Sequence, residues 1–227
     1  MTAVGELVVA SAIEPWQALG LCIEGGVARI GGIALRFVPP PAPVAAPVVA
    51  PGGVEPVAPP SAVVPPSGLM SWGLVGAPTE YTTIDGLATH HLEAPPDGPE
   101  NHPLGIVGFD HVVVMTSSLE RTCGAIEAAT GEPLRRVREA GAVRQGFHRL
   151  GELIVEVVEN ALVAGPHAAF WGFVWNVADV HDACDRLGPG LISLPRPAVQ
   201  AGRFIATVRQ EAGLGMPLAL MTPPSRH

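Results

Sequence analysis

One order of elements occurs twice in the second half of the chain, and it restricts the fold more than any other feature. Residues 107–116 form an apolar run rich in β-branched side chains, which is typical of a buried strand. Ser117 or Ser118 can cap the helix that follows, its apolar positions have helical spacing, and Gly131 ends it. Three short strands are then predicted, at 134–137, 144–150 and 153–158. The unit is therefore β-α-β-β-β.

The same unit begins again at residue 169. The segment AFWGFVWNV is predicted as a strand, Asp179 as the cap of a second helix, and Gly188 as its end. Strands are expected near 191–194, 203–209 and 217–222. Residues 105–223 are therefore expected to form one domain of two units.

The first 93 residues can be read as a third, degenerate βαβββ module. We predict a strand at 6–12, a helix at 15–23, a strand or hairpin at 28–38, and strands at 69–75 and 82–92. A Pro-rich segment at 39–66 interrupts this module; it holds eleven of the 25 prolines and is expected to be a semi-rigid linker. Because an unpaired unit exposes a sheet face, we expect it to pack on the main domain or to pair with a second copy in a homodimer.

Charge and composition restrict the class of partner. The net charge is −8, the pI is about 5.4, and all thirteen basic residues are arginine. An acidic protein is a poor partner for nucleic acid or an anionic membrane, and the absence of lysine excludes lysine-based catalysis. The N-terminus lacks a basic leader, and the three cysteines show no CxxC pair. We therefore expect a cytoplasmic protein that handles a small molecule.

Three segments carry a resemblance to a known family: GFDHVVVMTSSLERT at 108–122, FHRLGELIVEVVE at 147–159 and FWGFVWNVADVHDACDRLG at 170–188. They resemble the vicinal oxygen chelate superfamily, which includes glyoxalase I, bleomycin-resistance proteins, methylmalonyl-CoA epimerase and extradiol dioxygenases. The resemblance covers about residues 105–223. It implies an α+β, glyoxalase-like fold in which paired βαβββ modules enclose a cleft between curved sheets.

The resemblance also implies a metal site with one ligand from each of four strand positions. In this chain those positions hold His111, Glu156, Gly172 and Ala219, so two ligands are present and two are missing. A first-row divalent ion needs at least three protein ligands. We therefore expect a degenerate metal site, with a divalent metal at His111 and Glu156 as the less favoured alternative.

His111 and Glu156 are the candidate catalytic residues. His111 should face the cleft with Val113 and Met115, because alternate residues of a strand share a face. Glu156 lies in an apolar strand, and a buried carboxylate needs a partner, which His111 or an arginine could supply. A His–Glu pair can act as a general base. The alternative is a structural pair that remains from a lost metal site.

The other candidate ligand-binding residues come from three strands. They are Arg144, His148, Gly172, Val174, Asn176 and Ala219. Arg144 or Arg149 could bind a carboxylate or phosphate through two hydrogen bonds. Gly172 is expected to leave room for a bulky apolar ligand, while Trp171, Phe173 and Trp175 are expected to face the helix and fill the core.

Two functions of different class follow. The first is a binding protein whose metal-free cleft sequesters a small organic molecule. The second is a glyoxalase-like lyase, isomerase or epimerase that acts on a small carbonyl or carboxylate substrate through His111 and Glu156. A structural role, with the Pro-rich segment as a docking strip, is a third alternative.

Overall fold

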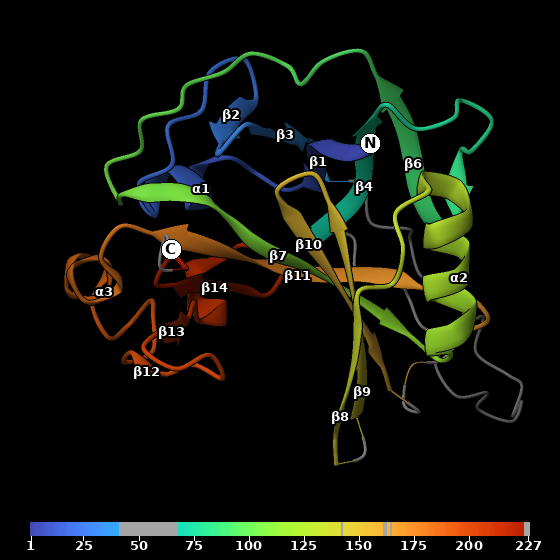
Figure 1. Ribbon diagram of the computed structural model, residues 1–227. Coiled ribbons are helices and arrows are strands. Elements are labelled where there is room, and N and C mark those ends of the chain that lie inside the picture. Colours follow the sequence, from blue (N-terminus) through green and yellow to red (C-terminus); the bar gives the residue numbers. More distant parts are fainter. Residues whose placement is uncertain (41–67, 142, 161–162, 164, 225–227) are drawn as a thin grey trace, which may run out of the picture.

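The structure of the 227-residue chain is a computed structural model that describes residues 1–40, 68–141, 143–160, 163 and 165–224. Nearly all of the Pro-rich segment lies outside the described residues. The described strands form two sheets, an N-terminal sheet of six strands and a C-terminal sheet of eight (Figure 1). No helix in the described part of the chain is both long and apolar enough to cross a membrane.

The C-terminal sheet consists of two βαβββ modules. The first contains β7 (Ile106–Thr116), α2 (Leu119–Thr130), β8 (Arg136–Ala140), β9 (Val143–Leu150) and β10 (Leu153–Glu159). The second contains β11 (Ala169–Val177), α3 (Val180–Leu187), β12 (Arg196–Pro197), β13 (Phe204–Thr207), a short 3-10 helix (Gln210–Ala212) and β14 (Leu218–Met221). The strand order is β12-β13-β14-β11-β7-β10-β9-β8. The two first strands pair antiparallel at the centre, and each is parallel to the last strand of its own module. This topology confirms the predicted α+β fold of paired βαβββ modules.

The helix boundaries follow from local chemistry. The Ser118 side chain accepts a hydrogen bond from the backbone N–H of Arg121, and Gly131 ends α2 in the left-handed conformation at φ 71°. In the second module the Asp179 carboxylate caps α3 in the same manner. The strand after α3 begins later than expected, at Arg196, and the expected strand at 191–194 is reduced to a single bridge between Ile192 and Val208.

The N-terminal sheet differs from the expected single module. It contains β1 (Ala3–Ala10), α1 (Glu14–Ala18), β2 (Val27–Ile30), β3 (Ile33–Val38), β4 (Gly68–Val75), β5 (Thr83–Ile84) and β6 (Leu87–Leu92), in the order β2-β3-β1-β4-β6-β5. β1 and β4 pair antiparallel at the centre, β1 is parallel to β3, and β4 is parallel to β6. These are the pairing rules of the C-terminal sheet with fewer elements, so the region is a pair of reduced modules.

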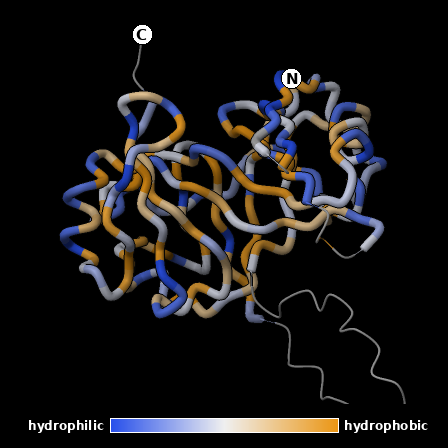
Figure 2. Tube along the Cα trace, turned by 90° about the horizontal axis from the view of Figure 1, so that it is seen from below, coloured by the Kyte–Doolittle hydropathy of each residue, from blue (hydrophilic) through white to orange (hydrophobic). Residues whose placement is uncertain are grey.

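The two sheets share one hydrophobic core. Trp16 is fully buried between them, with its ring centroid 5.3 Å from Phe37, 6.0 Å from Phe173 and 5.8 Å from Trp175. Figure 2 shows hydrophobic segments running through the interior and hydrophilic ones along the loops. The N-terminal strands are thus paired within the chain and packed on the main domain, which is one of the two arrangements expected.

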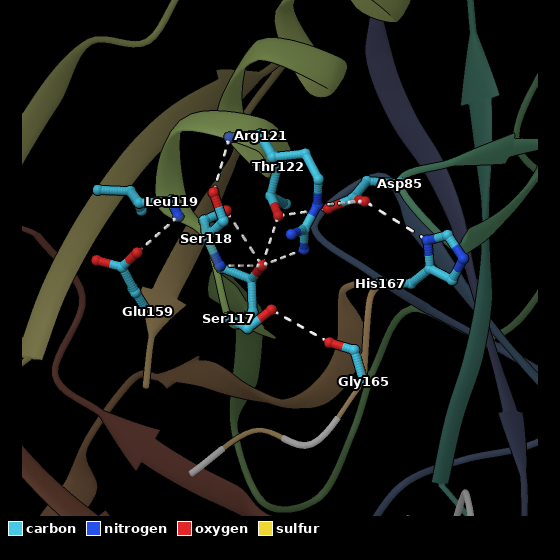
Figure 3. Close-up of polar contacts among 10 residues, drawn as sticks. Asp85, Ser117, Ser118, Leu119, Arg121, Thr122, Glu159, Gly165 and His167 are labelled. Carbon is cyan, nitrogen blue, oxygen red and sulfur yellow. Dashed lines mark hydrogen bonds and ion pairs between the residues drawn. The ribbon is translucent and has the colours of Figure 1, made fainter. Parts of the chain in front are cut away.

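A tight turn at Asp85 and Gly86, between β5 and β6, attaches the N-terminal sheet to α2 (Figure 3). The side chain of Asp85 is 4% exposed; its Oδ1 accepts from Arg121 Nε at 2.9 Å, and its Oδ2 lies 2.5 Å from Thr122 Oγ1. His167 Nδ1 lies 3.7 Å from the same carboxylate. These contacts hold the sheet against the start of α2, on the side of β7 that faces the core.

Candidate functional site

A cleft lies on the face of the C-terminal sheet that is turned away from the shared core. Along β7, Val112 and Val114 belong to the core, whereas His111 and Val113 line the cleft. The cleft has two lobes, with volumes of about 630 Å³ and about 530 Å³. His111, Glu156 and Ile205 line both lobes, so the two spaces meet at the His–Glu pair.

The larger space is here called the arginine lobe. Five of the thirteen arginines line it, from β8, β9, β12 and the residue before β8: Arg135, Arg136, Arg138, Arg149 and Arg196. Two of them have carboxylate partners: Arg135 lies 3.7 Å from Glu132, and Arg149 lies 3.0 Å from Glu152. For the other three, the described residues provide no ion pair within 4.0 Å, although the charge of Arg138 attracts that of Glu156 from a greater distance. An acidic protein therefore carries a concentrated positive charge in its cleft, which favours an anionic ligand.

The smaller space is here called the apolar lobe. Its walls are mainly aliphatic and aromatic side chains from β7, β10, β11 and β14: Val113, Met115, Val158, Trp171, Val174 and Ala219. Trp171 is 51% exposed, an unusual degree of exposure for so large an apolar side chain.

A chain of polar contacts runs under the junction of the lobes. His111 Nδ1 lies 2.8 Å from Asp110 Oδ1, and His111 Nε2 lies 3.2 Å from Glu156 Oε2. Glu156 also accepts from Gln145 Nε2 at 2.5 Å. Asp110 in turn accepts from the buried guanidinium of Arg203. Each nitrogen of the imidazole ring therefore faces a carboxylate.

A β-bulge explains how Asp110 and His111 can touch each other. Neighbouring residues of a regular strand point to opposite faces, but the pairing of β7 with β11 shifts register between Phe109 and His111. Asp110 is the residue left without a partner in that register. Sequence reasoning missed Asp110, Gln145 and Arg203 as site residues; for Asp110 the Asp-His pair itself was the available signal.

The two carboxylates have shifted pKa values in opposite directions. Burial raises the pKa of Asp110, but hydrogen bonds from His111 and Arg203 outweigh it and lower that pKa below the ordinary 3.8. Burial also raises the pKa of Glu156, and here it prevails over the attraction of His111 and Arg138, so the pKa stays above the ordinary 4.5. Asp110 is therefore the firmly charged partner that orients His111, and Glu156 is the carboxylate that takes a proton more readily.

The donor set does not fit the four-ligand metal site that the family resemblance implies. Among the described residues, no three His, Cys, Asp or Glu side chains gather where they could hold one ion. At the third position, a Cβ on Gly172 would collide with the carbonyl oxygen of Pro217. The expectation that Gly172 opens space in the cleft is therefore wrong, because Pro217, the residue before β14, fills that space.

The alternation of side chains along β9 also corrects the predicted ligand-binding roles of Arg144 and His148. Phe147 is paired with Glu156, which places odd-numbered residues of β9 on the cleft face and even-numbered ones on the α2 face. Arg144 accordingly binds Glu120 at 2.7 Å and Glu159 at 3.0 Å and lines neither lobe. His148 borders the arginine lobe, but its side chain is buried and its Nδ1 lies 3.1 Å from the carbonyl oxygen of Glu132.

Of the remaining predicted residues, four line the apolar lobe and one belongs to the polar network around Asp110. Val113, Met115, Val174 and Ala219 line the apolar lobe. Asn176 is buried, and its side-chain oxygen accepts a hydrogen bond from Arg203 at 2.9 Å. It therefore helps to hold the guanidinium that binds Asp110. The prediction that Trp171 fills the core is wrong, because a register shift between Phe170 and Gly172 turns it outward.

Comparison with known proteins finds similarity in solved structures only. Neither a family model nor a curated protein sequence matches the chain. The methylmalonyl-CoA epimerase of Mycobacterium tuberculosis is 15% identical with a TM-score of 0.45, over 53% of this chain and 91% of that one. A variant of the Streptomyces coelicolor methylmalonyl-CoA epimerase, in complex with 2-nitronate-propionyl-CoA, is 19% identical with a TM-score of 0.43, over 52% and 97%. At these identities the similarity extends to the fold alone, and it assigns neither a ligand nor a reaction to this chain.

Proposed function

We propose that this protein binds a small organic anion in the cleft of its C-terminal sheet, without a metal ion. The arginine lobe is the observation that carries the proposal. Arg136, Arg138 and Arg196 converge on it from opposite edges of the sheet, and the described residues leave them without ion pairs. A guanidinium group can bind a carboxylate or phosphate through two parallel hydrogen bonds.

The lobe also has the size and depth of a ligand site. A volume of about 630 Å³ lies within the range of pockets that hold drug-sized molecules. Arg138 lines the same lobe as Glu156, and its charge lowers the pKa of that carboxyl. A ligand anion bound there would complete the charge balance of a positively charged wall inside a protein with a net charge of −8.

Thermal unfolding in the presence of a panel of mono- and dicarboxylates, organic phosphates and neutral amides tests the proposal. A ligand at one hundred times its Kd stabilises the folded state by about 2.7 kcal/mol, or roughly 5 to 10 °C in Tm for a chain of this length. We expect such shifts from anions and none from amides. Arg138→Gln should reduce the shift, whereas Arg209→Gln, on an exposed loop outside both lobes, should not. Equal shifts in the two variants, or none with any anion, would refute anion binding.

A second candidate is an enzyme that moves a proton next to a carbonyl or carboxylate group. The observation that favours it is His111, which lies at the junction of the lobes between a firmly charged Asp110 and a more easily protonated Glu156. Asp110 would orient the ring, and His111 and Glu156 would exchange a proton with the ligand. The test is exchange of the ligand's α-proton for deuterium, followed by NMR. Exchange that is lost in His111→Gln supports catalysis, and exchange at the uncatalysed rate supports binding alone.

A further inference from the structure

We infer that the ligand is amphipathic, with an anionic group in the arginine lobe and an alkyl chain or aromatic ring in the apolar lobe. The anionic half of this inference rests on the proposed function. The apolar half rests on separate observations, which concern the second lobe and its connection to the first.

The apolar lobe is large, and most of the side chains that line it are apolar. Its volume is about 530 Å³, which is nearly that of the arginine lobe. Val113, Val174 and Ala219 form its floor and are each less than 10% exposed, and Met115 and Val158 form its sides. An apolar group placed there would leave water and meet side chains that form no hydrogen bonds of their own.

Trp171 gives the lobe an exposed aromatic wall. Its side chain is 51% exposed although the neighbouring aromatic residues of β11, Phe173 and Trp175, are buried. The register shift at Gly172 turns Trp171 to the cleft side, and it lines the apolar lobe. Covering this ring with an apolar ligand would bury a large surface that the folded chain leaves in water.

The two lobes adjoin each other, because His111, Glu156 and Ile205 line both. A single molecule that crosses the His–Glu pair would therefore reach from the arginines to Trp171. A ligand that filled only the arginine lobe would leave the apolar walls hydrated. The shape therefore selects molecules with a charged end and an apolar end, and both carboxylates and phosphates meet the requirement at the charged end.

Isothermal titration calorimetry with a homologous series tests the inference. The ligands are inorganic phosphate and butyl, hexyl and octyl phosphate, each below its micellar concentration, with octanoate, octanol and octyltrimethylammonium as head-group controls. Each methylene that enters the lobe should tighten binding about fourfold. Octanol and the cationic amphiphile should bind far more weakly, and the comparison of octanoate with octyl phosphate identifies the preferred anion.

Substitutions in the two lobes test which lobe binds each end of the ligand. Ala219→Phe fills the apolar lobe and should reduce the affinity for octyl phosphate to that for inorganic phosphate, whose own affinity should not change. Met115→Ser, at a half-buried position, provides the same test with less strain and should weaken the dependence on chain length. Ala88→Phe, at an exposed position of β6, is the matched control. Arg138→Gln should weaken all the phosphates by the same factor.

Each outcome decides a different claim. Affinity that is independent of chain length overturns the amphipathic ligand and leaves the proposed anion binding intact. Chain-length dependence that survives both Ala219→Phe and Met115→Ser also overturns it, because the chain then binds elsewhere. Binding that is unaffected by Arg138→Gln overturns the proposed function, and the absence of binding to every anion in the series overturns both.

Discussion

Arg203 is the residue on which the geometry of the His–Glu pair depends. Arg203 is 8% exposed, and its guanidinium donates to Asp110, to Asn176 Oδ1 at 2.9 Å and to the carbonyl oxygen of Thr222 at 2.6 Å. Asp110 is itself 7% exposed and holds His111. A buried carboxylate of this kind is tolerated only while its cationic partner is present.

Arg203→Met is therefore expected to destabilise the protein by about 3–5 kcal/mol, because the buried Asp110 carboxylate loses its permanently charged partner and keeps only the His111 ring beside it. Urea unfolding at neutral pH measures the change. The double variant with Asp110→Asn, which removes the stranded charge, should recover part of the loss. A loss below about 1 kcal/mol in the single variant would contradict the network described for Asp110.

His148 determines part of the pH dependence of stability. Burial lowers the pKa of its imidazole below the ordinary 6.5, although the carbonyl oxygen of Glu132 opposes this shift. The neutral ring therefore adds stability that is fully present above pH 6.5 and is lost as the pH falls through the lowered pKa. Urea unfolding between pH 8 and pH 5 should show this loss. His148→Asn can keep the contact with Glu132 without titrating, so its stability should fall less over that range; an equal fall would contradict the assignment.

At the scale of elements, the two βαβββ modules could be predicted because the information is local. Caps, glycine stops and apolar runs fix each helix and most strands within one or two residues. The side-chain directions could not be predicted, because register shifts in the β7–β11 pair are a property of the pairing. Alternation therefore failed for Asp110 and Trp171. The Asp85–Gly86 dipeptide is itself a typical hairpin signal, and both residues adopt the positive φ that such a turn requires, so the single strand expected at 82–92 is divided into β5 and β6.

The reduced modules of the N-terminal sheet place a different group of polar residues at positions similar to those of His111 and Glu156. Glu6 on β1 is 3% exposed; its carboxylate accepts from Arg36 Nε on β3 at 2.7 Å, and its other oxygen lies 2.7 Å from His90 Nε2 on β6. Arg36 is paired with Val8, two residues after Glu6, just as Glu156 is paired with Val113, two residues after His111. Both sheets thus place polar residues near their central strands, and in the N-terminal sheet they satisfy one another.

A substitution at Gly172 tests how closely β11 packs against Pro217, the residue before β14. Gly172→Ala should destabilise the protein by about 1–3 kcal/mol, because the new Cβ meets the carbonyl oxygen of Pro217. Gly124→Ala is the matched control: no heavy atom lies within 4 Å of its Cβ position in α2, so it should stabilise by up to about 1 kcal/mol. Thermal unfolding compares the two. Equal effects would contradict the close contact at Gly172.

At the scale of the whole molecule, the two sheets share one core, and we expect them to unfold together. Their buried side chains form one continuous cluster, and Trp16 and Trp72 of the N-terminal region contact aromatic rings of β11. The sequence predicts that the N-terminal region either packs on the main domain or pairs with a second copy of the chain, but it does not show that this region forms a complete sheet of its own. That closure depends on pairing between β1 and β4, which lie on either side of the Pro-rich segment.

Trp16→Ala is expected to destabilise the entire chain by about 3–5 kcal/mol and to retain a single unfolding transition. Far-UV circular dichroism and hydrogen exchange of the C-terminal strands should report the same midpoint. Trp171→Ala is the matched control and should change stability by less than about 1 kcal/mol, because its side chain is half exposed. Separate transitions for the two sheets would contradict the shared core.

The arrangement of charge across the molecule leads to the central proposal, that an acidic chain gathers five of its thirteen arginines in one cleft, where they bind an organic anion. The most direct measurement is a map of backbone amide chemical-shift changes on titration with hexyl phosphate. We predict saturable changes at Arg135–Arg138, Gln145 and Arg196, continuing to His111 and Glu156. Changes confined to the N-terminal sheet, or changes that do not saturate, would contradict the claim.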